Sequence, residues 1–249
     1  MTPRIIKGAK VIKKVFEKHE TLFCILLIVL YVVSNSLCMQ NFGVADPRSA
    51  VVNTVLSVAL AVLVIALKRG KYYGFAKVQE PRKFLWFVPL LLIISVNFWS
   101  GINLNHTPQE IIFHILTMLG VGFIEELVFR GFLFRMMAKD NLKIAILVNS
   151  LTFGIGHIIN LFNGADLVPT LLQVGYATAV GYLFVTITYR SGSIIPCIIA
   201  HSLNNSFSIF NAENDISTYV VPVFLMIVPT IYAIYINKQY KTDTNIQMV

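Results

Sequence analysis

The sequence predicts an all-α protein: a polytopic bundle of about eight transmembrane helices with both chain ends in the cytoplasm. Apolar residues make up 56% of the chain and charged residues only 13%, whereas ordinary soluble domains carry about 25% charged residues. The apolar residues form runs of the length that crosses a bilayer, about 17 to 25 residues. With the N-terminus in the cytoplasm, all of the 20 Lys and Arg residues except Arg48 fall on the cytoplasmic side, as the positive-inside rule requires.

Eight apolar stretches follow one another along the chain, and each is long enough for a spanning helix. We expect helices at residues 21–40, 50–67, 84–100, 108–128, 143–161, 168–189, 194–210 and 219–237. The first stretch is too long for the apolar core of a signal peptide and lacks a small-residue cleavage site, so we expect it to be retained. The first three and the last carry no recognisable motif and are expected to act as scaffold. Polar residues concentrate in the fourth, fifth and seventh stretches, where we expect the function to lie.

The chain divides into three parts. Residues 1–20 form a basic arm that we expect to lie on cytoplasmic headgroups, residues 21–237 form a single membrane domain, and residues 238–249 form a cytoplasmic tail. The formal charge of +8 follows from membrane orientation, because the basic residues crowd short loops and the chain ends. The sequence shows no face of interleaved aromatic and basic residues of the kind that binds nucleic acid, so we expect no nucleic-acid partner. We expect a multi-pass protein of the plasma membrane.

Two adjacent carboxylates, Glu125 and Glu126, stand near the end of the fourth apolar stretch. An acidic side chain at the centre of a membrane helix costs about 3 kcal/mol on insertion scales, so such residues usually face a polar interior and have a function. Arg130 lies on the same helix face as Glu126, where it can pair bidentately with the carboxylate. Glu125 points about 100° away and can face a cavity. We predict a structural role for Glu126 and Arg130 and a chemical role for Glu125; the alternative is an interfacial salt-bridge cluster.

A histidine follows two glycines in the fifth apolar stretch. Because small residues let helices approach closely in lipid, Gly154 and Gly156 would press His157 against the helix that carries Glu125. The two side chains differ in expected depth, and they meet only if the fourth helix continues past Val128 toward Met137. Phe153 lies one turn before His157 on the same face and would wall a pocket. The alternative is a histidine that only forms an interhelical hydrogen bond.

The seventh apolar stretch presents His201 and Asn205 four residues apart, on one face of the helix. An imidazole and a carboxamide side by side can donate two hydrogen bonds to one point, which is what an oxyanion hole needs. Polar contacts between helices are the alternative, and the neighbouring Asn204 is consistent with them. The three motifs in this order, on three separate helices, indicate a catalytic site more strongly than any one of them.

Glu-Glu-x-x-x-Arg, Phe-x-x-x-His and His-x-x-x-Asn together resemble the pattern of the CPBP family, the CAAX proteases and bacteriocin-processing enzymes, also called Abi. The resemblance covers a motif core at about residues 108–210 and is to a bacterial member. It implies an eight-helix intramembrane peptidase whose cavity opens toward the cytoplasmic leaflet. In bacteria it implies peptide maturation or bacteriocin self-immunity, and in eukaryotes the C-terminal trimming of prenylated proteins. The expected catalytic residues are Glu125, Glu126, Arg130, His157, His201 and Asn205, with Phe153 in the substrate pocket.

Two mechanisms remain open from the residues. In the first, Glu125 is the general base that activates a water molecule, His157 orients that water, and His201 with Asn205 stabilises the oxyanion. In the second, Glu125, His157 and His201 bind a catalytic Zn²⁺ with an open position for water. The sequence has no His-Glu-x-x-His motif, and the pairing of Asn205 with His201 favours the metal-free mechanism. Cys197, one turn before His201, is the only thiol placed near the motifs.

Two other classes of protein compete with the peptidase. A non-catalytic immunity or scaffold protein could keep the motif residues and act by binding. A proton-coupled transporter would show inverted repeats or matching helix breaks, and the prolines of this chain form no such symmetric arrangement. We therefore expect an intramembrane endopeptidase that binds hydrophobic or lipidated peptides within the bilayer.

Overall fold

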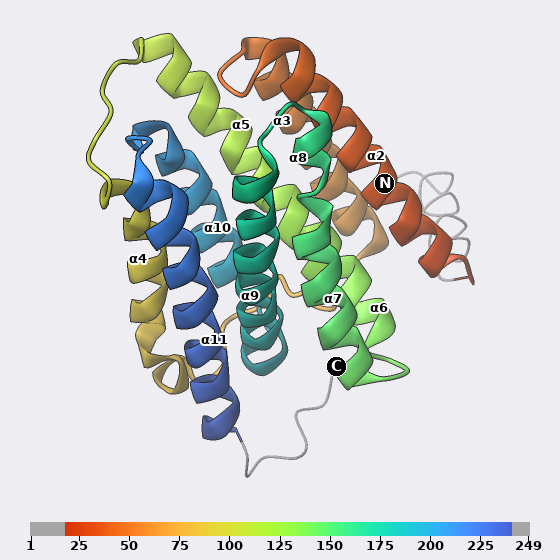
Figure 1. Ribbon diagram of the computed structural model, residues 1–249. Helices are drawn as coiled ribbons and strands as arrows, with labels where there is room; N and C mark the ends of the chain where they lie inside the picture. Colours follow the sequence, from red (N-terminus) through yellow and green to blue (C-terminus); the bar gives the residue numbers. More distant parts are fainter. Residues whose placement is uncertain (1–17, 241–249) are drawn as a thin grey trace, which may run out of the picture.

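A computed structural model describes residues 18–240, and in this part of the chain helices account for the regular structure, with one isolated bridge between Ile102 and Asn211. The long helices are α2 (Glu20–Phe42), α3 (Pro47–Leu67), α5 (Pro108–Glu126), α7 (Leu142–Gly156), α9 (Leu167–Ser191), α10 (Ile195–Phe207) and α11 (Val221–Gln239). Shorter segments are η1 (Pro81–Phe87), α4 (Val88–Ser95), η2 (Val96–Phe98), η3 (Leu127–Phe134), α6 (Arg135–Met137), α8 (Ile159–Phe162), η4 (Ser208–Phe210) and η5 (Ile216–Val220). Helices α4, α10 and α11 lie on one side of the bundle and α2 and α3 on the other, with α5, α7 and α9 between them (Figure 1).

The prediction of an all-α membrane bundle is confirmed. Seven candidate membrane spans are found among the described residues, and each coincides with a predicted stretch. The remaining predicted stretch, 194–210, forms α10 of 13 residues. At 1.5 Å per residue this helix is about 20 Å long, shorter than the roughly 30 Å apolar core of a bilayer. Most of the predicted basic arm and of the C-terminal tail lies outside the described residues.

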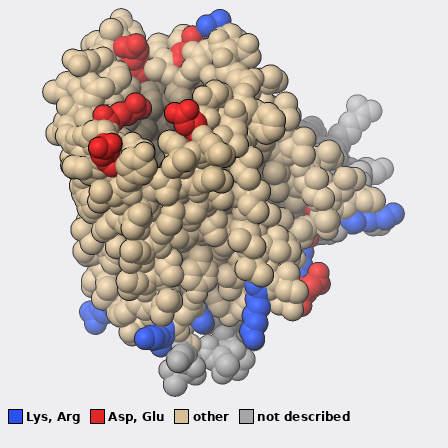
Figure 2. Space-filling view, viewed as in Figure 1, with Lys and Arg blue, Asp and Glu red and all other residues tan. Residues whose placement is uncertain are grey.

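Charge separates the two ends of the bundle. Lys and Arg gather at the end where α3, α9 and α11 finish, whereas Asp and Glu gather at the opposite end (Figure 2). The start of α2 belongs to the Lys/Arg end, because Glu20 pairs with Lys139 in the loop between α6 and α7. The first and last described helices therefore begin and end on the same side, as predicted.

Glycines set the distances between helices around the centre of the bundle. A Cβ atom at Gly122 of α5 would lie 2.8 Å from backbone atoms of Ser202 on α10, and one at Gly120 would lie 3.2 Å from the backbone of Asn53 on α3. Helix α5 therefore contacts α3 and α10 almost backbone to backbone, which is how small residues stabilise helix pairs in lipid. This contact brings the acidic motif of α5 beside the histidine of α10.

The expected role of the fifth-stretch glycines needs correction. A Cβ atom at Gly154 would lie 2.6 Å from the Val174 carbonyl oxygen of α9, whereas within residues 18–240 no atom lies within 4 Å of a Cβ at Gly156. Gly154 therefore packs α7 against α9 rather than against α5. Gly156 borders a cavity instead of a helix.

The two glycines give a matched test of this packing. We expect Gly154→Ala to lower the thermal unfolding temperature of the detergent-solubilised protein, because overpacking of this kind costs about 1–3 kcal/mol. Gly156→Ala should leave the temperature unchanged or raise it slightly, since alanine favours the helix by up to about 1 kcal/mol. Equal effects of the two substitutions would contradict the close α7–α9 contact.

Candidate active site

The helix that carries the acidic motif continues well beyond it. A single span covers Pro108–Met137, in which α5 ends at Glu126 and the π-helical segment η3 begins at the next residue. Such π segments are rare and often lie at functional sites. The extension confirms the condition under which Glu125 and His157 can meet. It also places Glu125 about 25 Å along the helix from Pro108, deep in the membrane.

Glu126 and Arg130 form a buried ion pair, as the spacing predicts. Arg130 Nη1 donates to Glu126 Oε1 at 3.0 Å, and both side chains are fully buried. The pairing is not bidentate, because Arg130 Nη2 donates instead to the Gly181 carbonyl of α9 at 3.4 Å. The guanidinium also lies 4.1 Å from the centre of the Phe153 ring, a favourable cation–π geometry. Arg130 thus connects α5, α7 and α9 around one carboxylate.

His201 lies between the two adjacent carboxylates. Its Nδ1 donates to Glu126 Oε1 at 2.8 Å, and its Nε2 lies 3.6 Å from Glu125 Oε2. The Glu126 bond fixes the ring orientation and leaves Nε2 directed at Glu125. Glu126 is therefore a positioning residue, whereas Glu125 remains available to a bound molecule, with 13% of its side chain exposed.

Tyr31 holds the second oxygen of Glu125. Its hydroxyl donates to Glu125 Oε1 at 2.5 Å, and its side chain, from α2, is buried. Tyr31 is not among the site residues predicted from the sequence, because the first helix carries no motif and was expected to act as scaffold. An isolated tyrosine in an apolar run gives no periodic or spacing signal, so only the packing of α2 against the α5 region reveals its partner.

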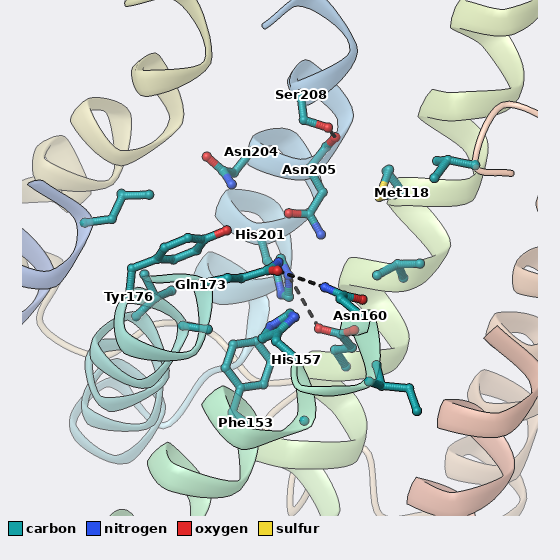
Figure 3. A pocket seen from close by; sticks show the side chains of 18 of the residues that line it. Met118, Phe153, His157, Asn160, Gln173, Tyr176, His201, Asn204, Asn205 and Ser208 are labelled. Atoms are coloured by element: carbon teal, nitrogen blue, oxygen red, sulfur yellow. Dashed lines mark hydrogen bonds and ion pairs between the residues drawn. The ribbon is translucent and has the colours of Figure 1, made fainter. Parts of the chain in front are cut away.

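His157 and Phe153 both reach the cavity from α7 and its C-terminal end (Figure 3). The Phe153 ring lies edge-on to both imidazoles, with centroid distances of 5.6 Å to His157 and 5.8 Å to His201. Phe153 is itself 5% exposed. It therefore separates the histidines from the bundle core and forms part of the pocket wall, as expected.

Asn205 projects into the cavity one turn above His201 on α10 (Figure 3). Among the described residues its carboxamide has no hydrogen-bond partner, although its backbone oxygen contacts His114 Nε2 at 3.2 Å. Its carboxamide is therefore available to a bound molecule. His114 of α5 is buried and contacts the α10 backbone at this point.

These side chains line a cavity of about 620 Å³. Its walls carry several carboxamides, including Asn204, Asn205 and an Asn160–Gln173 pair joined by a 2.8 Å hydrogen bond (Figure 3). Lining residues extend to Ala165, before α9, and to Ser217, before α11, so the mouth lies at the acidic end, where the surface is visibly hollowed (Figure 2). The family resemblance implies an opening toward the cytoplasmic leaflet; in this chain the mouth lies opposite the Lys/Arg end.

The metal-dependent mechanism requires three ligands that converge on one point. Within residues 18–240 no three His, Cys, Asp or Glu side chains are arranged to hold a metal ion, so Glu125, His157 and His201 do not fit a zinc site as they stand. Cys197 is fully buried, and its thiol donates to the Phe184 carbonyl at 3.5 Å. Cys197, although one turn from His201 along the chain, does not line the cavity described above.

A multi-pass helical bundle with a polar site at membrane depth is the architecture of an intramembrane enzyme. Comparison with protein families identifies a specific group: residues 107–207 match the family described as Type II CAAX prenyl endopeptidase Rce1-like. This segment therefore carries a domain of the CPBP family, and the resemblance drawn from the motifs is confirmed. At family level, the domain is that of a CAAX-type intramembrane protease. Comparisons with curated proteins and with solved structures found no match for the chain.

Removal of the central cation tests the buried network. We expect Arg130→Ala to reduce the amount of folded protein in the membrane sharply, because breaking a buried ion pair costs about 3–5 kcal/mol. The double variant Glu126→Gln/Arg130→Met should recover much of this loss, since it leaves no buried charge and keeps an acceptor for His201. Abundance and thermal stability of the three proteins, measured by fluorescence-detected gel filtration, provide the check. A double variant no more stable than Arg130→Ala would contradict the account.

Proposed function

We propose that the protein is an endopeptidase of the plasma membrane that hydrolyses hydrophobic or lipidated peptides with a water molecule activated by Glu125. The observation that carries the proposal is the position of Glu125. Tyr31 and His201 each contact one of its oxygens, and it faces a cavity large enough for a peptide segment. The family match supports the reaction class.

The reaction begins when Glu125 accepts a proton from a water molecule, whose oxygen attacks the carbonyl carbon of the scissile bond. His157, which also lines the cavity, orients the water. The oxyanion of the tetrahedral intermediate accepts hydrogen bonds from Asn205 Nδ2 and His201 Nε2. Protonated Glu125 then transfers the proton to the leaving nitrogen, the C–N bond breaks, and the carboxylate is regenerated.

Donation from His201 Nε2 requires protons on both ring nitrogens. The carboxylates of Glu125 and Glu126 flank the ring and offset this positive charge, and Glu126 is in turn neutralised by Arg130. The Glu126–Arg130 pair thus supplies a fixed acceptor for His201 without adding net charge to a site of low dielectric constant. This assigns each motif residue a distinct task.

The biological role that we favour is maturation of a secreted peptide or bacteriocin, or self-immunity. A membrane-buried cavity with apolar and carboxamide walls can bind an extended apolar peptide and satisfy the backbone groups that lipid leaves without partners. If the protein acted only by binding, its ionisable cluster would be dispensable. Substitution of Glu125 therefore distinguishes a peptidase from a binding protein.

We expect Glu125→Gln to abolish peptide release while the protein remains in the membrane, because the amide has nearly the same shape as the carboxylate but cannot accept the proton. His157→Ala and His201→Ala should reduce release at least about a hundredfold, the usual cost of losing one such group. Comparative peptidomics of membranes that carry wild-type or variant protein measures these effects. Unchanged peptide profiles in all three variants would contradict the proposed roles and favour a binding protein.

A chelator distinguishes the two mechanisms. The same peptide profile with and without chelator would support activation of water by Glu125 alone. Loss of the peptides with recovery on addition of Zn²⁺ would contradict it and require a metal-bound arrangement of Glu125, His157 and His201.

Tyr31→Phe tests the support of Glu125. The substitution removes one hydroxyl and one hydrogen bond to a charged acceptor, worth about 1.5–3 kcal/mol. We expect kcat to fall by roughly ten- to a hundredfold with KM nearly unchanged, because Tyr31 positions the base and does not hold the peptide. Tyr72→Phe is a matched control, since Tyr72 lies in the loop at the Lys/Arg end, where its hydroxyl contacts the Arg135 carbonyl at 3.5 Å and Lys139, and it does not line the cavity. An equal loss in both variants would indicate a general packing effect.

A further inference from the structure

The cavity opens at the end of the bundle that carries few Lys and Arg residues. The loops before η1 and between α6 and α7, together with the last turn of α11, carry Lys and Arg, whereas the opposite end carries Arg48 as its only described basic residue. Under the positive-inside rule the Lys/Arg end faces the cytoplasm. The mouth, near Ala165 and Ser217, therefore faces the noncytoplasmic side.

The cytoplasmic end of the site is closed by a layer of aromatic residues. Phe129 and Phe132 of η3 are 6% and 0% exposed. Tyr73, from the loop between α3 and η1, packs on Phe132 with a centroid distance of 4.5 Å. That loop is itself attached to the start of α10, because Ile194 N donates to the Gly74 carbonyl at 2.9 Å. A peptide approaching from the cytoplasm would have to displace this packed core.

The wall above Glu125 is suited to an extended peptide backbone. Asn160, Gln173 and Asn204 line the path between the mouth and the catalytic groups, and Asn205 stands directly above His201. Carboxamides both donate and accept hydrogen bonds, so they match the alternating N–H and C=O groups of a peptide. The path therefore leads from the noncytoplasmic surface to the base.

We propose that the substrate reaches Glu125 from the noncytoplasmic side, as a peptide segment that already lies in or beyond the outer half of the membrane. The inference rests on the proposed endopeptidase function and specifies its substrate: the tail or loop of a membrane-inserted or translocated peptide, cleaved after it has crossed. The reaction that supplies the substrate is consequently a membrane insertion or translocation step. A cytoplasmic protein with an anchored C-terminus does not present its scissile bond to this mouth.

Cysteine labelling tests the direction of access independently of catalysis. The natural cysteines Cys24, Cys38 and Cys197 are buried and serve as an internal background. In right-side-out membrane vesicles, a membrane-impermeant maleimide should label Ala165→Cys but not Lys77→Cys, which lies at the Lys/Arg end. In inside-out vesicles the pattern should reverse. Ser217→Cys is a second mouth position in case the first variant assembles poorly, and labelling in detergent verifies that each thiol is reactive.

A second readout connects access with hydrolysis. A quenched fluorescent library of water-soluble peptides should be cleaved when applied to the noncytoplasmic face, and prior labelling of Ala165→Cys should reduce cleavage at least tenfold. Labelling of Ala165→Cys from the cytoplasmic face, or cleavage confined to inside-out vesicles, would overturn the inference. Correct labelling with no cleavage even in detergent would leave the direction of the mouth intact and contradict the proposed peptidase function instead.

Discussion

The buried contact of Glu126 with Arg130 and His201 is the constraint on which the site depends. A carboxylate with no exposed surface at membrane depth is tolerated only with a cation and hydrogen-bond donors around it. Arg130 supplies the cation and reaches α9 through the Gly181 carbonyl, while His201 supplies a donor from α10. The network thereby fixes α9 and α10 relative to α5 and orients the ring that faces Glu125. Helix geometry thus directs Glu126 into the buried network and leaves Glu125 facing the cavity.

Much of the site follows from the sequence because its residues lie at helical spacings. Glu126 and Arg130 at i and i+4, and His201 and Asn205 at i and i+4, had to share faces, and both pairs do so in the structure. The different environments of Glu125, which lines the cavity, and Glu126, which is fully buried, were also predictable from their angular separation. The sequence could not predict that Arg130 forms one hydrogen bond to Glu126 rather than two. The second nitrogen of Arg130 donates instead to the carbonyl of Gly181, 51 residues farther along the chain.

The features that could not be predicted depend on packing between distant helices. Tyr31 has no motif around it, yet the approach of α2 gives it the shortest contact to Glu125. The partner of Gly154 is α9 rather than α5, because glycine patterns show that a close approach exists but not which helix makes it. The direction of the cavity likewise requires the aromatic layer around Phe132, whose closure of one end involves a loop from another part of the chain.

A structure of the purified protein with a hydrophobic peptidyl trifluoromethyl ketone would test the central claim most directly, because its hydrate resembles the tetrahedral intermediate and binds tightly to a site built for it. The account predicts one oxygen of the hydrate against Glu125 and the other within hydrogen-bonding distance of Asn205 Nδ2 and His201 Nε2, with the peptide extending toward Ala165. An oxygen coordinated to a metal ion held by Glu125, His157 and His201 would contradict the proposed mechanism, and so would an inhibitor bound outside this cavity.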